Sequence, residues 1–139
     1  MMTIALRSLF VLLIVLSPLA AQEDEAGCKD HPLLTRMAGF YIDTCQNAEF
    51  DSQEFETSDE NTVTVEGRKA EIRYFVKEGA RRVSALQVLR NYLNAIRTAG
   101  GTVVWSDEHL GRGTARLAAG GRETWVAVRA FDAGDGCDL

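Results

Sequence analysis

The amino-acid sequence predicts an α+β fold in which a mostly antiparallel sheet of about five to six strands packs against one long amphipathic helix at about residues 85–99. Three observations support this class. Short segments rich in β-branched and aromatic residues are separated by glycines or polar turns, which is typical of antiparallel strands. One segment in the second half places apolar residues at helical spacing. Strand-like segments stand on both sides of it along the chain.

The first 21 of the 139 residues have the pattern of a removable Sec-type signal peptide. Arg7 precedes an apolar run at 9–16, and cleavage fits after either Ala20 or Ala21. The run is shorter than the ~20 residues of a transmembrane helix, so a membrane anchor is the less favoured alternative. We therefore expect residues 22–139 to form one domain in the periplasm, without a transmembrane span after cleavage. Association with the outer membrane and truncation of this domain at its C-terminus are left open.

The first strands are predicted from composition and alternation. Strand propensity appears at residues 38–42, and residues 48–55 alternate loosely around two phenylalanines. The polar residues 57–61 predict a loop. Residues 62–66 and 68–77 then flank a glycine, and they predict a β-hairpin or two closely following strands.

The helix signal is the clearest local pattern in the sequence. Ser84 and Gln87 are spaced as a capping box, and the glycines at 100–101 predict the end of the helix. The apolar stripe between them consists of Leu86, Leu89, Leu93 and Ile96, widened by Tyr92 and Ala95.

Three further strands are predicted after the helix. They cover residues 102–105, 114–117 and 123–131. The glycines at 120–121 are typical of a two-residue hairpin turn between the last two. The whole chain therefore runs in the order strands, helix, strands.

The expected mature chain contains three cysteines. An oxidising compartment permits disulfides, and we predict one between Cys28 and Cys45, which lie 17 positions apart. Cys137 is then free, disordered or paired with another chain. No Cys-x-x-Cys motif occurs, and His31 and His109 are isolated, so neither a zinc site nor thioredoxin-like chemistry is predicted.

Charge is unevenly distributed along the chain. The sequence holds 15 Lys and Arg against 20 Asp and Glu, a formal net charge of −5, which argues against a general nucleic-acid binder. Residues 22–66 are strongly acidic, whereas residues 67–139 carry a basic excess. The favoured explanation is that acidic strands lie beside basic ones in one sheet. The alternative is a basic face for phosphate or another acidic partner.

A candidate interaction surface follows from the helix. Arg81, Arg82, Arg90 and Arg97 lie on or just before it, and no acid occurs between Glu78 and Asp107. Guanidinium groups match phosphate and carboxylate geometry, so this surface could contact lipid headgroups, lipopolysaccharide phosphates or an acidic domain. A solvated helix face paired with the acidic half of the chain is the favoured alternative.

No catalytic, cofactor-binding or metal-binding residues are predicted, and the chain is not expected to be an enzyme. Asp30 and His31 are adjacent, so they rarely face each other, and His31 with Pro32 predicts a turn instead. No serine lies in a Gly-x-Ser-x-Gly elbow. The glycines at 111 and 113 are too few for a dinucleotide loop.

Six short motifs follow one another along the expected mature chain, namely GCKDHPLLTR at 27–36, EFDS at 49–52, VEGR at 65–68, IRY at 72–74, KEGA at 77–80 and LQVLRNY at 86–92. In this order they resemble the N-terminal periplasmic region of certain OmpA family proteins. The resemblance spans about residues 27–132. In that family this region is typically followed by an OmpA-like domain that binds peptidoglycan, and no such domain occurs here. The resemblance therefore implies a peptidoglycan contact only if a further C-terminal domain exists.

The sequence thus predicts a non-enzymatic exported cell-envelope protein, an interaction or structural module of an OmpA family protein in the periplasm. Its expected partner is an envelope protein or an outer-membrane component. The alternative is a small periplasmic carrier that holds a lipid or hydrophobic ligand between helix and sheet. The residues that suggest this carrier are the aromatic side chains Tyr74, Phe75, Trp105 and Trp125, for which a role in the core is the favoured interpretation.

Overall fold

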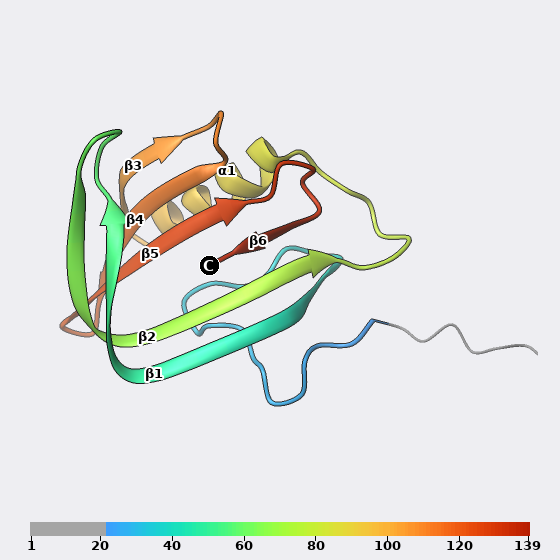
Figure 1. The fold of residues 1–139 in the computed structure, drawn as a ribbon, viewed down its shortest axis with the longest axis horizontal. Helices are drawn as coiled ribbons and strands as arrows, with labels where there is room; N and C mark the ends of the chain where they lie inside the picture. The colour runs from blue at the N-terminus through green and yellow to red at the C-terminus, as the bar shows by residue number, and fades with distance from the viewer. Residues whose placement is uncertain (1–21) are drawn as a thin grey trace, which may run out of the picture.

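The computed structural model of the protein describes residues 22–139, so the predicted signal peptide at 1–21 lies outside the described residues. The described chain forms a six-stranded antiparallel sheet in the order β1-β2-β6-β5-β4-β3, with one helix (Figure 1). The elements are β1 (Phe40–Glu56), β2 (Thr62–Val76), α1 (Ala85–Thr98), β3 (Thr102–Asp107), β4 (Arg112–Ala119), β5 (Arg122–Ala130) and β6 (Gly136–Asp138).

The predicted fold class is wrong, because no long helix forms a second layer within residues 22–139. The helix has 14 residues, whereas β1 has 17 and β2 has 15. At 1.5 Å per residue the helix is about 21 Å long, and at about 3.3 Å per residue β1 extends more than twice as far. The helix therefore packs mainly on β3, β4 and β5, behind the sheet in Figure 1. The fold is mostly antiparallel sheet with one short helix.

The first two strands form a single long hairpin. The predicted loop at 57–61 is confirmed as its turn. Residues 62–66 and 68–77 do not pair with each other, because both belong to β2, which pairs with β1 along its length. Gly67 lies at a register shift between Ala48 and Asp51, so it marks a β-bulge and not a turn.

The outer part of this hairpin, residues 51–67, bends away from the rest of the sheet, and we call it the arm (Figure 1). The ring of Phe55 packs 5.6 Å from that of Trp125 on β5. Because side chains alternate along a strand, Trp125 lies on the face opposite the buried Val128. The arm therefore covers the face of β3–β5 that the helix does not cover, which we call the outer face.

The helix begins as its sequence predicts, but its buried face differs in part, because Val88 belongs to it whereas Leu86 is half-buried and Ala95 is exposed. The Ser84 hydroxyl accepts a hydrogen bond from the Gln87 backbone N–H at 3.1 Å, which confirms the cap. Five helical residues are buried against the sheet, namely Val88, Leu89, Tyr92, Leu93 and Ile96. Gly113 on β4 lies directly beneath them, since a Cβ built there would meet Leu89 and Leu93 at 3.2 Å. The absence of a side chain at 113 thus allows close contact between helix and sheet.

Two turns near the C-terminus complete the sheet. Gly120 and Gly121 both have positive φ, 59° and 75°, and they join β4 to β5 in the predicted hairpin. Strand β6 then inserts between β2 and β5, antiparallel to both. Cys137, at the middle of β6, is fully buried and free, which settles the three alternatives considered for it.

We expect Gly113→Val to destabilise the protein by about 1–3 kcal/mol, because the added methyl groups overpack the contact with Leu89 and Leu93. Urea denaturation measures this change. The matched control is Ala118→Val on the same strand, where the side chain is exposed and the free energy of unfolding should change by less than about 0.5 kcal/mol. Equal effects of the two substitutions would contradict this account of the helix–sheet contact.

Candidate functional site

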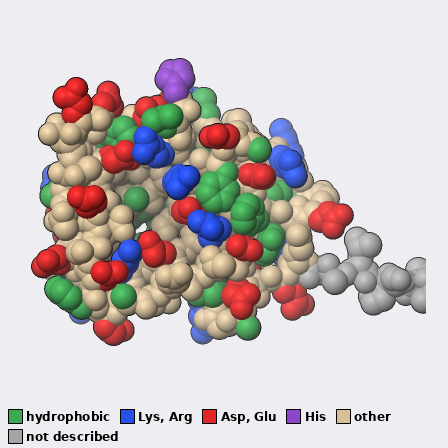
Figure 2. Space-filling model, viewed as in Figure 1, with side chains coloured by type: hydrophobic (Ala, Val, Ile, Leu, Met, Phe, Trp, Pro, Cys, Tyr) green, Lys and Arg blue, Asp and Glu red, His purple; other side chains and the backbone are tan. Residues whose placement is uncertain are grey.

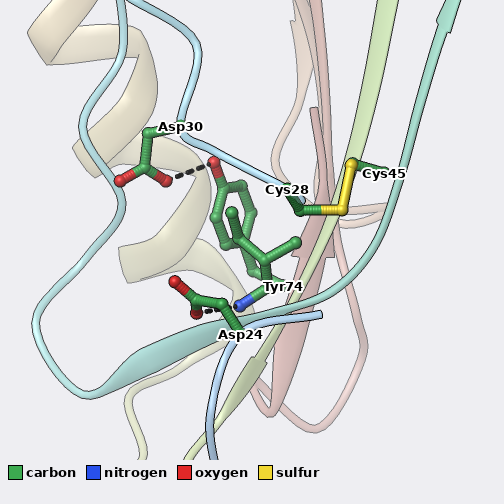
Figure 3. The surroundings of a disulfide bond; sticks show 6 residues. Asp24, Cys28, Asp30, Cys45 and Tyr74 are labelled. Atoms are coloured by element: carbon green, nitrogen blue, oxygen red, sulfur yellow. Dashed lines mark hydrogen bonds between the residues drawn. A yellow bond between two sulfur atoms is a disulfide. The ribbon is translucent and has the colours of Figure 1, made fainter. Parts of the chain in front are cut away.

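The predicted disulfide between Cys28 and Cys45 is confirmed, with the two Cα atoms 5.8 Å apart (Figure 3). It joins the N-terminal segment, residues 22–39, to β1. This segment has no helix or strand of its own, so the disulfide and a set of polar contacts fix its position. A covalent link of this kind reduces the conformational entropy of the unfolded chain.

A hydrogen-bonded network fastens the same segment to the sheet. Arg36 donates to both oxygens of Asp30 at 3.0 Å, and it also forms an ion pair with Asp24. The Tyr74 hydroxyl donates to Asp30 at 2.8 Å, and the Ile42 backbone N–H donates to Asp24 at 2.8 Å (Figure 3). Hydrogen bonding by Arg36, then by the Ile42 amide, lowers the pKa of Asp24. Each carboxylate in this network is matched by donors from the protein itself.

Two groups that could serve in catalysis, the Cys137 thiol and the His31 imidazole, are engaged by the fold. Burial raises the pKa of the Cys137 thiol to about 12, so this thiol stays neutral at physiological pH. Burial lowers the pKa of His31, whose Nδ1 accepts from the Leu33 backbone N–H at 3.3 Å. His31 therefore belongs to the predicted turn, and the neighbouring Asp30 is turned to Tyr74 and Arg36 instead.

The four arginines of the predicted interaction surface are all exposed. Arg90 donates through Nε and Nη2 to Glu108, both at 2.8 Å, and Arg97 donates to Asn94 at 2.9 Å. Glu108 lies in the turn between β3 and β4, which is 18 residues from Arg90 in the sequence. The charge of Arg90 is thus offset by an acid that the helix segment alone does not reveal.

Sequence reasoning missed the outer face of the sheet, which the arm partly covers. The Trp105 indole N–H donates to Asp59 at 2.9 Å, and Arg112 donates to Glu56 at 2.8 Å. Trp105 on β3 and Trp125 on β5, two of the aromatic residues that suggested a ligand carrier, therefore both contact the arm. No local pattern signals these contacts, because they join residues 46 to 70 positions apart.

The outer face is hollowed beside the arm. The hollow has a volume of about 510 Å³. It is lined by Leu110, Arg112, Arg129, Ala130, Phe131 and Asp132. In Figure 2 basic side chains follow one another across the middle of this face, with acidic and hydrophobic side chains beside them.

The interface between helix and sheet offers less room. Gly113 lies in close contact with Leu89 and Leu93, and the helical side chains that face the sheet are buried. The hollows lined by Arg112 and Arg129 and by Lys69 and Glu71 both lie elsewhere. No observation therefore places a carried ligand between helix and sheet.

Comparison with known proteins assigns this chain to no family. A scan against protein-family models, a search of curated proteins and a search of solved structures each return no match. The resemblance to OmpA family proteins rests on the sequence motifs alone, and it stays a prediction.

Two further features are absent from residues 22–139, a membrane-spanning helix and a cluster of metal-binding side chains. No helix in this range is both long enough and apolar enough to cross a membrane. No group of three or more His, Cys, Asp or Glu side chains in this range has an arrangement that could hold a metal ion.

We expect Asp24→Ala to lower the melting temperature at pH 7 by a few degrees, because Asp24 accepts from Arg36 and Ile42. Its pKa is lower in the folded protein than the ordinary 3.8. Its contribution is therefore present above that value and is lost as the pH falls through the folded pKa. The difference between wild type and variant should shrink as the pH falls below 3.8 and vanish once the carboxyl is protonated in both the folded and the unfolded state.

The matched control for this substitution is Glu23→Ala, which removes the neighbouring exposed acid. Glu23 makes no side-chain hydrogen bond within the described chain, so its removal should leave the melting temperature unchanged. Thermal melts followed by circular dichroism provide the measurement. A difference for Asp24→Ala that persisted at low pH would contradict the role assigned to its carboxylate.

Proposed function

We propose that this chain is a non-enzymatic exported protein of the cell envelope, an interaction module in the periplasm related to the OmpA family. The observation that carries the proposal is the disulfide between Cys28 and Cys45. Structural disulfides form and persist in oxidising compartments such as the bacterial periplasm. This support is independent of the signal-peptide pattern at 1–21, because both cysteines belong to the folded domain.

The burial of one thiol and the hydrogen bonding of two carboxylates support an interaction role over catalysis. The buried thiol of Cys137 has a raised pKa, and the carboxylates of Asp24 and Asp30 are engaged by donors of the same chain. A general base or nucleophile needs a free lone pair and a pKa near the working pH. The two carboxylates serve instead to fix the N-terminal segment.

Within the predicted basic surface we place the proposed partner contact at Arg81, Arg82 and Arg97. These side chains are exposed, and no acid lies within ion-pair distance of them in the part of the chain that the structure describes. Arg90 is excluded because its Nε and Nη2 both donate to Glu108, so its charge is already paired. An acidic envelope partner would provide the carboxylates or phosphates that guanidinium groups bind.

The proposal predicts a defined covalent state for the protein expressed with its full sequence in a Gram-negative host. Recovered from the periplasm, its intact mass should match a chain that begins after Ala20 or Ala21. One cysteine should react with an alkylating agent after unfolding, and three after reduction. A mass that retains residues 1–21, or three cysteines reactive without reduction, would overturn export.

The interaction surface is tested by a photo-crosslinking amino acid placed at Arg97, with the same substitution at Arg122 as control. Arg122 is exposed on β5, at the far end of the strand from its buried Val128. Crosslinks to an envelope component from position 97, with none from 122, are expected. Absence of crosslinks at 97, 81 and 82 in living cells would overturn this surface while leaving the export result unaffected.

A further inference from the structure

A row of charged residues crosses the outer face from edge to edge. Each member is paired in register with the next one on the neighbouring strand, so all lie on one face of the sheet. In order from β3 to β2 the row is Asp107, Arg112, Arg129, Asp138 and Arg73. Two arginines, Arg112 and Arg129, therefore stand directly opposite each other in its middle.

The acids of this row are already engaged by other groups. Arg73 donates to both oxygens of Asp138, at 2.7 and 3.2 Å. Asp107 accepts from the backbone N–H groups of His109 and Leu110, at 2.8 and 3.0 Å. Neither acid forms an ion pair with Arg112 or Arg129.

Arg129 is the member of the row that forms no ion pair within residues 22–139. It lies between Arg112, which carries the same charge, and Asp138, whose two oxygens both accept from Arg73. Like charges directly opposite each other destabilise a sheet. Arg112 is only partly engaged, because Glu56 takes Nη1 and leaves Nε and Nη2 without a partner in the described chain. Together the two guanidinium groups offer a set of unused donors to an anion.

These donors border a site of suitable size and mixed character. The hollow of about 510 Å³ falls within the range of small-molecule sites. Its apolar wall includes Phe131 and Leu110, and Leu110 is 51% exposed. Asp132 is the one acid of the lining, so the site has a small positive excess and disfavours polyanions.

We propose that this hollow binds an amphiphile with one small oxyanion, a carboxylate or a phosphate, whose anionic end contacts Arg112 and Arg129. The apolar part of the ligand packs against Leu110 and Phe131. A bound oxyanion relieves the repulsion between the two arginines and covers the exposed leucine at the same time. This site lies on the opposite face of the sheet from the helix, so it is separate from the partner contact proposed above.

The test is an NMR titration of the purified, disulfide-bonded chain 22–139 with four probes below their micelle-forming concentrations. The probes are octanoate, octyl phosphate, inorganic phosphate and the neutral octyl glucoside. Saturable amide shifts centred on Leu110, Arg129 and Phe131 are expected with either octyl anion, and the tighter of the two identifies the headgroup. Inorganic phosphate should bind at least about 10-fold more weakly. Equal binding of octyl glucoside, or no saturable shift with either octyl anion, would overturn the proposal.

A pair of variants separates a specific site from general attraction by charge. Arg129→Gln should weaken binding of the preferred octyl anion about 10-fold, as the loss of one charged contact implies. Its melting temperature should not fall, because the substitution removes a like-charge pair. Arg122→Gln removes an exposed arginine of the same strand that does not line the hollow, and it should leave binding unchanged. Equal weakening by both variants would overturn the assignment.

Discussion

The architecture depends on the three residues of β6, Gly136–Asp138. This short strand joins the two parts of the described sheet by hydrogen bonds. On one side lies the β1–β2 hairpin, and on the other the β5-β4-β3 meander. Gly136 at the start of β6 lies under Phe131, and a Cβ there would come within 2.4 Å of the Tyr74 carbonyl oxygen. Only glycine permits this approach. The aromatic contact of Phe75 with Phe131, at 5.4 Å, then closes over the junction.

Charge pairing reinforces this arrangement across the two halves of the sequence. The acidic residues Glu49 and Glu56 of β1 form ion pairs with Arg68 on β2 and Arg112 on β4. The explanation favoured from the sequence, acidic strands beside basic ones, is thus what the structure shows. Exposed pairs of this kind contribute little stability each, so their main effect is to fix which strands and which faces meet.

The features that the sequence predicts are those whose causes lie within a few residues. The helix cap at Ser84, the glycine turn at 120–121 and the disulfide between two nearby cysteines are of this type. The length of β1 is different, because two register shifts interrupt its alternation and divide one strand into two apparent segments. The short strand at 136–138 could not be predicted from the sequence either, because Gly, Cys and Asp have little strand propensity. One of its two partner strands, β2, is distant in the sequence.

The same reasoning explains why the candidate sites could be predicted only in part. Helical spacing does place Arg90 and Arg97 on one exposed face, but the acid that engages Arg90 arrives from another turn. The arginine pair at 112 and 129 is created by the register of β4 and β5, which no single segment encodes.

The position of the hollow follows from how far the arm reaches. The arm contacts β5 at Trp125, and Phe131 lies six positions further along the chain, about 20 Å away at the rise of an extended strand. Two paired strands are about 5 Å apart, so the arm is too narrow to cover both ends of β5. The helix cannot cover the remainder, because it packs on the other face. The end of β5 that carries Arg129 is therefore left open beside the arm, and Arg112 contributes both to the contact with Glu56 and to the lining of the hollow.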